Sequence, residues 1–323
     1  MTGLAYVFPG QGSQVVGMGR DLADRYPAAA AVFATADEAL GEPISRLAWE
    51  GPADELNRTE NAQPALVAAS VAYFDALNEQ MLAAGVVFPK PRFITGHSMG
   101  QYSAAVGTGA IVDGDAIRLV RERGRLMQSS GSGRDGAMAA VLGLDEAAVP
   151  ELVRRASAVG VFGIANRNSP GQVVVSGERP AIEAAVEIGR ELGAKRVLVL
   201  PVSVAAHSPL MAEAASGMRQ VLAGASVSDP VVPMLANADA HPITTADGVR
   251  TELVEHLTAG VDFVRAVETM TAGGVDTFVE VGPGKVLTNL IKRIAPEATA
   301  IALDDADAFE RLVAISTPAA TTA

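Results

Sequence analysis

The stretch FITGHSMGQY, residues 93–102, limits the possible folds more than any other part of the sequence. It contains the pattern G-x-S-x-G, in which a strand turns sharply into a helix and presents a serine at the turn. Side chains two places before and after Ser98 would collide at such a turn, and both positions are glycine. Residues 92–95 read as a short strand, and the chain becomes helical from Gln101 onward. The stretch predicts a strand–turn–helix unit with Ser98 as a nucleophile; the alternative is a structural turn.

Strand and helix patterns alternate around this unit. Residues 4–8 read as a short buried strand, and residues 28–40, 62–84 and 113–128 read as helices, with apolar side chains of residues 62–84 near helical spacing. Further on, residues 276–281 form a strand pattern, GPG a turn and residues 285–294 a helix pattern. Such alternation is typical of a mainly parallel sheet covered by helices, which places the chain in the α/β class.

The pattern changes after a polar, glycine-rich joint at residues 129–136. The order that follows is β-α-β-β-α-β, the ferredoxin-like arrangement, with expected elements at 138–142, 146–156, 159–165, 172–176, 180–192 and 196–200. We therefore expect a small domain at residues 133–202, inserted into a discontinuous large domain formed by residues 1–132 and 203–315. Residues 316–323 are expected to be a disordered tail.

The composition excludes several kinds of site and partner. The chain of 323 residues has no cysteine, which excludes disulfides, a thiol nucleophile and Cys-based metal sites. Its net charge of −12 argues against nucleic acid as a partner. No signal peptide is expected at the start of the sequence and no membrane span anywhere, because the apolar runs are too short. We expect a cytoplasmic protein without a metal.

A nucleophilic serine needs a base, and the chain has four histidines. His97 is adjacent to the serine in sequence and would point away from it. His241 lies in a polar loop, and His256 lies on an expected helix. His207, in SVAAHSPLM, stands where the chain re-enters the large domain, so we favour it as the base over a structural role. The backbone N–H of Met99, at the start of the helix after the turn, is placed to stabilise an oxyanion.

One arginine occupies an unexpected position on the helix at 113–128. Four charged residues share one solvated face at helical spacing: Arg118, Arg121, Glu122 and Arg125. Arg123 instead lies on the apolar stripe with Leu119, Leu126 and Met127. A guanidinium that faces the core is costly without a partner, so Arg123 must meet an anion. That anion is either a structural carboxylate or a carboxylate of the substrate, which the planar guanidinium binds with two donors.

Seven sequence blocks together resemble the malonyl-CoA:acyl carrier protein transacylases, and they occur in that family's order. The blocks are FPGQGSQ (8–14), AQPAL (62–66), GHSMG (96–100), RERGRLMQ (121–128), NSPGQVVVSG (168–177), VSVAAHSPLM (202–211) and VEVGPGKVL (279–287). The resemblance extends from Leu4 to about Ile294.

The resemblance implies a large domain like an α/β-hydrolase core beside the ferredoxin-like domain. It also implies a ping-pong acyl transfer. Ser98 would attack the thioester of malonyl-CoA with His207 as general base, which leaves a malonyl ester on the serine. The phosphopantetheine thiol of an acyl carrier protein would then take the malonyl group. The backbone N–H groups of Gln11 and Met99 would form the oxyanion hole. The family orients this histidine mainly with backbone carbonyls. No bound cofactor is expected, because the coenzyme A thioester is the substrate, and we expect a monomer.

The resemblance also gives the substrate pocket its residues. Arg123 matches the family arginine that pairs with the malonyl carboxylate, and Gln63 matches a glutamine of the same pocket. A basic rim formed by Lys195, Arg196, Lys285, Lys292 and Arg293 would suit an acidic carrier protein; ordinary solvated side chains are the alternative.

Three positions depart from the family pattern. Gln101 replaces a common glutamate after the turn, which removes one charge near the nucleophile. His256 replaces a glutamine whose main-chain oxygen supports the catalytic histidine, a role that survives substitution. Ala206 precedes His207 where related polyketide acyltransferases often carry Phe or Ser, so an α-substituted malonyl group remains an alternative substrate.

Three other functions compete with malonyl transfer. A serine hydrolase would use the same turn, but it would leave the buried Arg123 unexplained. An acyltransferase that moves a processed acyl group between carrier proteins would not need that arginine. A non-catalytic subunit derived from the family would not need Ser98 and His207. Malonyl transfer uses all three residues, and the free carboxylate of malonyl is the anion that Arg123 requires. A buried arginine also disfavours acetyl and long saturated acyl groups, which leave the cation unpaired.

Overall fold

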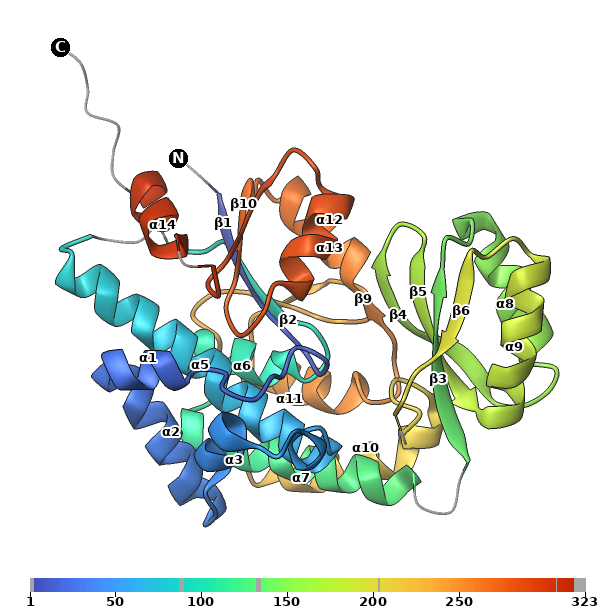
Figure 1. Cartoon of the computed structure of the whole chain (residues 1–323), viewed down its shortest axis with the longest axis horizontal. Coiled ribbons are helices and arrows are strands. Elements are labelled where there is room, and N and C mark those ends of the chain that lie inside the picture. Colours follow the sequence, from blue (N-terminus) through green and yellow to red (C-terminus); the bar gives the residue numbers. More distant parts are fainter. Residues whose placement is uncertain (1–2, 87–89, 132–134, 203, 306, 317–323) are drawn as a thin grey trace.

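Two β-sheets with separate cores organise the chain in the computed structural model, which describes residues 3–86, 90–131, 135–202, 204–305 and 307–316 (Figure 1). The strand order of the first sheet is β11-β10-β1-β2-β7-β8. Its strands are β1 (Leu4–Phe8), β2 (Phe93–Gly96), β7 (Met234–Leu235), β8 (Pro242–Ile243), β10 (Thr277–Glu280) and β11 (Thr299–Ala302). The pairs from β11 to β7 are parallel, and only the β7–β8 pair is antiparallel. The prediction of a mainly parallel sheet is confirmed.

Strand β1 shows why helices must cover both faces of this sheet. Leu4, Tyr6 and Phe8 belong to one hydrophobic core, whereas Ala5 and Val7 belong to another on the opposite face. Successive side chains of a strand point to opposite faces, so an all-apolar strand has to be buried on both. The first face packs against the helices that include α5, and the second against α12 and α13 (Figure 1).

The helices around the first sheet come from both halves of the chain. They are α1 (Arg20–Arg25), α2 (Pro27–Leu40), α3 (Ile44–Glu50), α4 (Ala53–Leu56), α5 (Thr59–Ala83), α6 (Gly100–Gly107), α7 (Asp113–Gly131), α10 (Ala212–Ala223), α11 (Ala246–Glu255), α12 (Phe263–Ala272), α13 (Val286–Ile294) and α14 (Ala308–Ser316), with the short 3₁₀ turn η2 (Pro209–Met211). No helix in these described stretches is long and apolar enough to cross a membrane.

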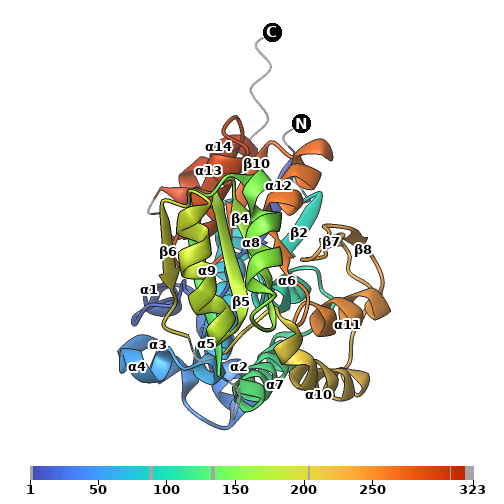
Figure 2. The same cartoon turned by 90° about the vertical axis from the view of Figure 1, so that its right-hand side faces the viewer.

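The second sheet has the order β6-β3-β5-β4-β9. Its elements are β3 (Gly136–Leu142), η1 (Glu146–Ala148), α8 (Val149–Ala156), β4 (Phe162–Ser169), β5 (Gln172–Glu178), α9 (Arg179–Glu191), β6 (Arg196–Val199) and β9 (Val261–Asp262). The antiparallel set β6-β3-β5-β4 with both helices on one face is the predicted ferredoxin-like arrangement. Figure 2 shows α8 and α9 side by side over the outer face. The inner face contributes Met138 and Val174 to the cleft between the sheets.

Several predicted boundaries were wrong. The strand expected at 159–165 runs from Phe162 to Ser169, because its polar end NRNS pairs with β5 through two register shifts and hides the strand signal. The joint expected at 129–136 is helical up to Gly131, and β3 begins at Gly136. Residues 132–134 lie outside the described residues.

The C-terminal elements β11 and α14 had no counterpart in the sequence analysis. Ser316 belongs to α14, so the tail expected at 316–323 does not begin there, and residues 317–323 lie outside the described residues. The domain limits 1–132 with 203–315 and 133–202 stay a prediction. One strand crosses them, because β9 comes from the expected large domain and pairs in parallel with β4 of the small one.

The turn between β2 and α6 depends on a close approach of backbones, which predicts the effect of one substitution. A Cβ on Gly100 would lie 2.4 Å from the backbone oxygen of Phe8. Gly100→Ala should therefore lower the free energy of unfolding in urea by about 1–3 kcal/mol, the cost of overpacking. Gly163→Ala is the matched control, because a Cβ there has nothing within 4 Å. Equal urea midpoints for the two variants would contradict this packing argument.

Candidate active site

Ser98 occupies the turn between β2 and α6 with a left-handed backbone, φ 53°. A positive φ is strained for a residue with a Cβ, and such strain is often found at functional sites. The predicted strand–turn–helix unit is confirmed. The turn lifts the serine hydroxyl to the carboxyl end of the parallel strands, which is the edge where open α/β sheets bind ligands.

Asn237, which follows β7, braces this turn. Its side-chain oxygen accepts from the Ser98 backbone N–H at 2.9 Å, and its Nδ2 donates to the Gly96 carbonyl at 2.7 Å. Its own backbone N–H donates to Glu252 Oε1 at 2.9 Å, and the same oxygen accepts from Gln101 Nε2 at 2.7 Å. The sequence analysis missed Asn237 and Glu252, because no local pattern links a loop asparagine and a helical glutamate to a distant turn.

The structure changes our interpretation of Gln101, which replaces a glutamate that is common in the family. We interpreted it as the loss of a charge beside the nucleophile, but the carboxylate of Glu252 lies directly next to this glutamine. Gln101 also accepts from the Gly96 backbone N–H at 3.0 Å and donates to the Leu235 carbonyl at 2.9 Å. Burial is the largest influence on Glu252 and raises its pKa, whereas the hydrogen bonds from Gln101 and Asn237 act in the opposite direction.

His207 contacts the serine directly. Its Nε2 lies 2.8 Å from Ser98 Oγ, and its Nδ1 lies 2.6 Å from the His256 carbonyl oxygen and 3.0 Å from that of Ala259. Carbonyl oxygens only accept hydrogen bonds, so the imidazole proton is on Nδ1 and the lone pair of Nε2 faces the serine hydroxyl. Two backbone carbonyls thus hold the ring in the orientation that a carboxylate provides in Ser-His-Asp triads.

The environment keeps His207 neutral. Burial lowers its pKa to about 3, helped by the positive charge of Arg123. A neutral imidazole with a free Nε2 can accept the proton of Ser98.

Arg123 lies on α7 with 1% of its surface exposed. Its Nη2 donates to Ser98 Oγ at 3.2 Å, and its Nε donates to His256 Nε2 at 3.1 Å. Among the described residues no carboxylate forms a salt bridge with it, so the alternative of a structural carboxylate partner finds no support there. Burial lowers its pKa to about 10, which leaves the guanidinium charged at neutral pH.

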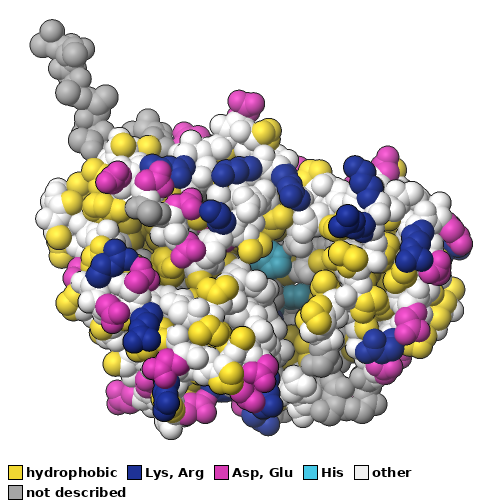
Figure 3. Space-filling view, viewed as in Figure 1, with side chains coloured by type: hydrophobic (Ala, Val, Ile, Leu, Met, Phe, Trp, Pro, Cys, Tyr) yellow, Lys and Arg dark blue, Asp and Glu magenta, His cyan; other side chains and the backbone are white. Residues whose placement is uncertain are grey.

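These groups open into a cleft of about 650 Å³ between the two sheets. Ser98, His207, Arg123 and Gln63 line it from the larger part, and Asn168 and other residues line it from the smaller part. Figure 3 shows histidine side chains at the bottom of this hollow, with Lys and Arg side chains on both sides of its upper edge. His97 Nε2 lies 2.9 Å from Asn168 Oδ1, so this ring is directed toward β4 of the second sheet.

Three further predicted residues have groups without a protein partner. The backbone N–H groups of Gln11 and Met99 have no hydrogen-bond acceptor within the described residues. The side-chain oxygen of Gln63 is buried and unpaired there, and its Nε2 contacts only the sulfur of Met127 at 3.6 Å. Gln11 and Gln63 line the cleft, and Met99 follows the serine.

The five residues of the expected basic rim are all exposed. Lys195 and Arg196 stand at the start of β6, whereas Lys285, Lys292 and Arg293 belong to α13 and its N-cap. Lys285 pairs with an aspartate at 3.3 Å, and Arg293 Nη1 donates to a glutamine of β5 at 3.0 Å, so two of the five have partners. Helix α13 and the segment after β6 both line the cleft.

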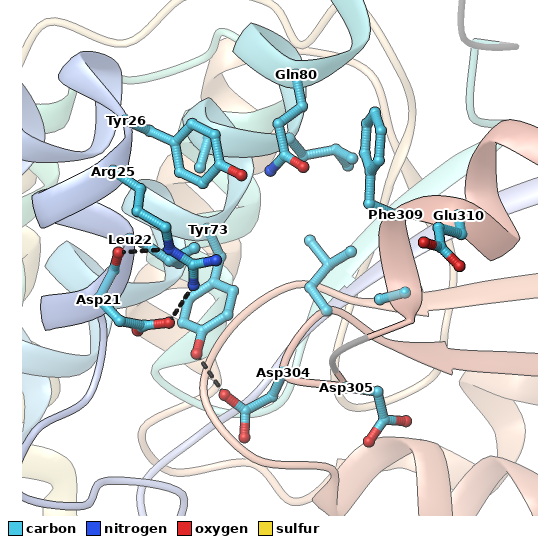
Figure 4. Close-up of a pocket in the computed structure, with 14 residues that line it drawn as sticks. Asp21, Leu22, Arg25, Tyr26, Tyr73, Gln80, Asp304, Asp305, Phe309 and Glu310 are labelled. Carbon is cyan, nitrogen blue, oxygen red and sulfur yellow. Dashed lines mark hydrogen bonds and ion pairs between the residues drawn. The ribbon is translucent and has the colours of Figure 1, made fainter. Parts of the chain in front are cut away.

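A second cavity, of about 420 Å³, lies between α1, α5 and α14 (Figure 4). Its carboxylates are largely satisfied within the protein: Asp21 pairs with Arg25, Asp304 accepts from the Tyr73 hydroxyl, and Asp305 pairs with a lysine. Its lining has no serine, histidine or cysteine. No cluster of three metal-ligating side chains is found in the described ranges. The cleft at Ser98 is therefore the candidate active site.

Comparison with known proteins shows which family the whole chain resembles. The acyl transferase domain family matches residues 5–306. The chain is 45% identical over 309 residues to the malonyl CoA-acyl carrier protein transacylase of Escherichia coli (strain K12), covering 96% of this chain and 98% of the relative. It is 40% identical over 311 residues to the enzyme of that name from Bacillus subtilis (strain 168), covering 96% of both chains.

Solved structures are similar over the same length. An acyl carrier protein S-malonyltransferase from Vibrio cholerae superposes with a TM-score of 0.90 at 40% identity, covering 96% of this chain and 100% of the other. A malonyl-transacylase solved in complex with its type II PKS acyl-carrier protein superposes with a TM-score of 0.91 at 39% identity, covering 97% and 100%.

The lowered pKa of His207 predicts how stability depends on pH. The folded protein keeps this ring neutral down to about pH 3, whereas an unfolded chain protonates it near 6.5. Its contribution is present above 6.5 and is lost as the pH falls toward 3. Between pH 7 and pH 5 the free energy of unfolding should fall by about 2 kcal/mol more in the wild type than in His207→Gln. Parallel pH curves for the wild type and His207→Gln would exclude a buried neutral His207.

Proposed function

This chain belongs to the acyl transferase domain family, and on that premise we propose that Ser98, His207 and Arg123 form its catalytic centre. The enzyme transfers a malonyl group from malonyl-CoA to the phosphopantetheine thiol of an acyl carrier protein. One observation carries the assignment of the residues: a charged guanidinium without a carboxylate partner in the described chain lies 3.2 Å from the hydroxyl that contacts His207. Such an arrangement suits a substrate with an acyl carbon at one end and a carboxylate at the other.

In the first half of the proposed reaction, Ser98 Oγ attacks the thioester carbonyl carbon while its proton moves to His207 Nε2. The carbonyl oxygen becomes an oxyanion, which accepts from the backbone N–H groups of Gln11 and Met99. When the tetrahedral intermediate collapses, the C–S bond breaks, and CoA leaves with the proton from His207. A malonyl ester remains on Ser98. The availability of both N–H groups supports their role as the oxyanion hole.

The second half repeats these steps with another nucleophile. The phosphopantetheine thiol gives its proton to His207 Nε2, and its sulfur attacks the ester carbonyl. The C–O bond to Ser98 then breaks, and the serine recovers the proton from His207. The backbone carbonyls on Nδ1 stabilise the transient imidazolium in both halves.

Arg123 is proposed to bind the malonyl carboxylate. Two of its donors have neutral acceptors, His256 and Ser98, and the remaining N–H groups can bind a carboxylate with two parallel hydrogen bonds. Gln63 lines the same cleft with an amide that is only weakly bonded, so it can donate to an oxygen of the acyl group. An acetyl group would leave the buried cation without an anion, which explains selection against it.

Partner recognition extends the proposal to the edge of the cleft. Lys195, Arg196 and Lys292 have no salt-bridge partner within the described residues, and with Lys285 and Arg293 they form the proposed docking rim for an acidic carrier protein. The coenzyme A thioester is the substrate. The cytoplasmic location and the monomeric state stay predictions of the sequence.

A second substrate class has one observation in its favour. Ala206 lines the cleft beside His207, and its small side chain leaves room next to the α-carbon of the acyl group. An α-substituted malonyl group, as used in polyketide synthesis, would keep the carboxylate that Arg123 binds.

Mass spectrometry of Ser98 tests the proposed function. Incubation with malonyl-CoA should add one malonyl group to the peptide that contains Ser98, and Ser98→Ala should stay unmodified. The adduct should persist for minutes without an acceptor and disappear when a pantetheine thiol is added. Rapid loss to water would indicate a hydrolase. Parallel incubations with methylmalonyl-, ethylmalonyl- and acetyl-CoA establish the acyl specificity, and we expect the least labelling from acetyl-CoA.

The role of Arg123 makes a separate prediction. Arg123→Ala removes one partner of a desolvated charge pair, so the second-order rate of malonyl loading should fall by an amount equivalent to roughly 2–4 kcal/mol. The rate of acetyl loading should change far less, because acetyl has no carboxylate. Stopped-flow loading with each thioester measures both rates. Unchanged malonyl loading in a folded Arg123→Ala protein would refute the role.

A further inference from the structure

His256 contacts both halves of the catalytic centre. It caps the C-terminus of α11 and is 1% exposed. Its backbone oxygen accepts from His207 Nδ1 at 2.6 Å, and its imidazole Nε2 lies 3.1 Å from Arg123 Nε. The first contact involves the main chain and tolerates any side chain. The second depends on the imidazole itself, and none of the steps above uses it.

The protons of this contact can be assigned from chemistry. Arginine Nε carries a hydrogen and never accepts, so Nε2 of His256 must present its lone pair and the ring hydrogen must be on Nδ1. Nδ1 is buried and has no hydrogen-bond partner in the described chain. The ring therefore lacks a hydrogen bond at Nδ1 and makes one at Nε2 with a charged donor. A hydrogen bond to a charged group is stronger than one between neutral groups, so the Nε2 contact is the more favourable of the two.

The neighbours of His256 keep the ring neutral. Its ring centroid lies 6.3 Å from that of Tyr102, in a T-shaped arrangement, and 6.3 Å from that of His207. Burial is the main cause that lowers its pKa, followed by the charges of Arg123 and of His207 when the latter is protonated. A charged ring would bring an N–H against the N–H of the guanidinium, so only the neutral form is compatible with the observed contact.

The contact restricts the orientation of the guanidinium. Arg123 donates from Nε to His256 and from Nη2 to Ser98 Oγ, and two donor contacts fix a planar group in space. Its remaining N–H groups belong to a side chain that lines the cleft. Without the imidazole acceptor, Nε–H would be a buried donor without a partner, and the side chain would have to turn to satisfy it.

We propose that His256 is a positioning residue that holds Arg123 in the orientation for binding a carboxylate, and thereby sets the preference for dicarboxylic over monocarboxylic thioesters. The inference rests on the proposed function, because it assumes that Arg123 binds the acyl carboxylate. It assigns two separate tasks to one residue: the main chain orients the base, and the side chain orients the arginine.

The experiment compares loading of the full-length enzyme with malonyl-CoA and acetyl-CoA. His256→Leu removes the acceptor and keeps the main-chain oxygen, so kcat/KM for malonyl-CoA should fall about tenfold to a hundredfold, mainly through KM. The rate with acetyl-CoA should change less than about twofold, since Arg123 gives that acyl group no ion pair. His256→Gln should restore most of the preference, because its side-chain oxygen can accept from Nε–H.

A neutral serine reagent tests the main-chain task separately. Phenylmethanesulfonyl fluoride should label Ser98 at the wild-type rate in His256→Leu, because His207 keeps its carbonyl partners. His241→Leu is the matched control, an exposed histidine that pairs with Asp239 and should leave every rate unchanged. If His256→Leu does not fold, as judged by its melting temperature, His256→Asn replaces it, because the shorter amide reaches the position of Nδ1 rather than Nε2.

The outcomes separate the inference from the function on which it rests. A folded His256→Leu or His256→Asn that retains the malonyl-to-acetyl ratio would overturn the positioning role. A parallel loss of both rates and of reagent labelling would also overturn it, because the effect would then act through His207. Arg123→Ala in the same assay tests the premise: if it loads malonyl normally, Arg123 does not bind the acyl carboxylate, and that part of the proposed function fails whatever the His256 variants do.

Discussion

The buried charge of Arg123 is the constraint on which the rest of the site depends. Removing a guanidinium from water is costly, and the described chain offers it neutral acceptors instead of a carboxylate. In its proposed role, this positive charge is available to an anion that arrives with the substrate. The same charge helps to keep His207 and His256 neutral, which leaves the base able to accept a proton. In the proposed mechanism, Arg123 therefore contributes both to the selection of the substrate and, after burial, to keeping the base neutral.

A second requirement is a rigid turn, because the serine hydroxyl must meet both His207 and Arg123. Ser98 and His207 both have left-handed backbone conformations, with φ 53° and φ 59°. Asn237, which follows β7, accepts a hydrogen bond from the turn and donates one to Glu252, which in turn accepts one from Gln101. Each polar group in this network bonds to another part of the fold, so the strained turn is held from several directions.

Parallel strands bring these groups together. Gln11 follows β1, Ser98 follows β2 and Asn237 follows β7, all at the carboxyl ends of neighbouring strands. The second sheet closes the other side of the cleft. Strand β9, from the expected large domain, pairs with β4 of the second sheet and so connects the two sides. Loops far apart in the sequence therefore become adjacent, which is the general reason that α/β sheets bind ligands at this edge.

The sequence allowed accurate prediction wherever the signal was local. The glycines around Ser98 predict a tight turn, and the position of Arg123 among apolar neighbours predicts a buried cation. Signals that depend on distant partners were missed. The polar end of β4 becomes a strand only because β5 and β9 supply its hydrogen bonds, and Glu252 resembles any solvated residue of an amphipathic helix until its partner Gln101 is known.

The sequence by itself thus determined the α/β class, the turn at the serine and the presence of a cation that needs an anion, because each follows from residue spacing along one strand or helix. Only the tertiary structure decided which histidine meets the serine, that no described acid neutralises Arg123, and that His256 serves both residues with different atoms. Each of those facts depends on residues that are far apart in the chain, up to 133 positions for Arg123 and His256, and only folding brings their side chains into contact.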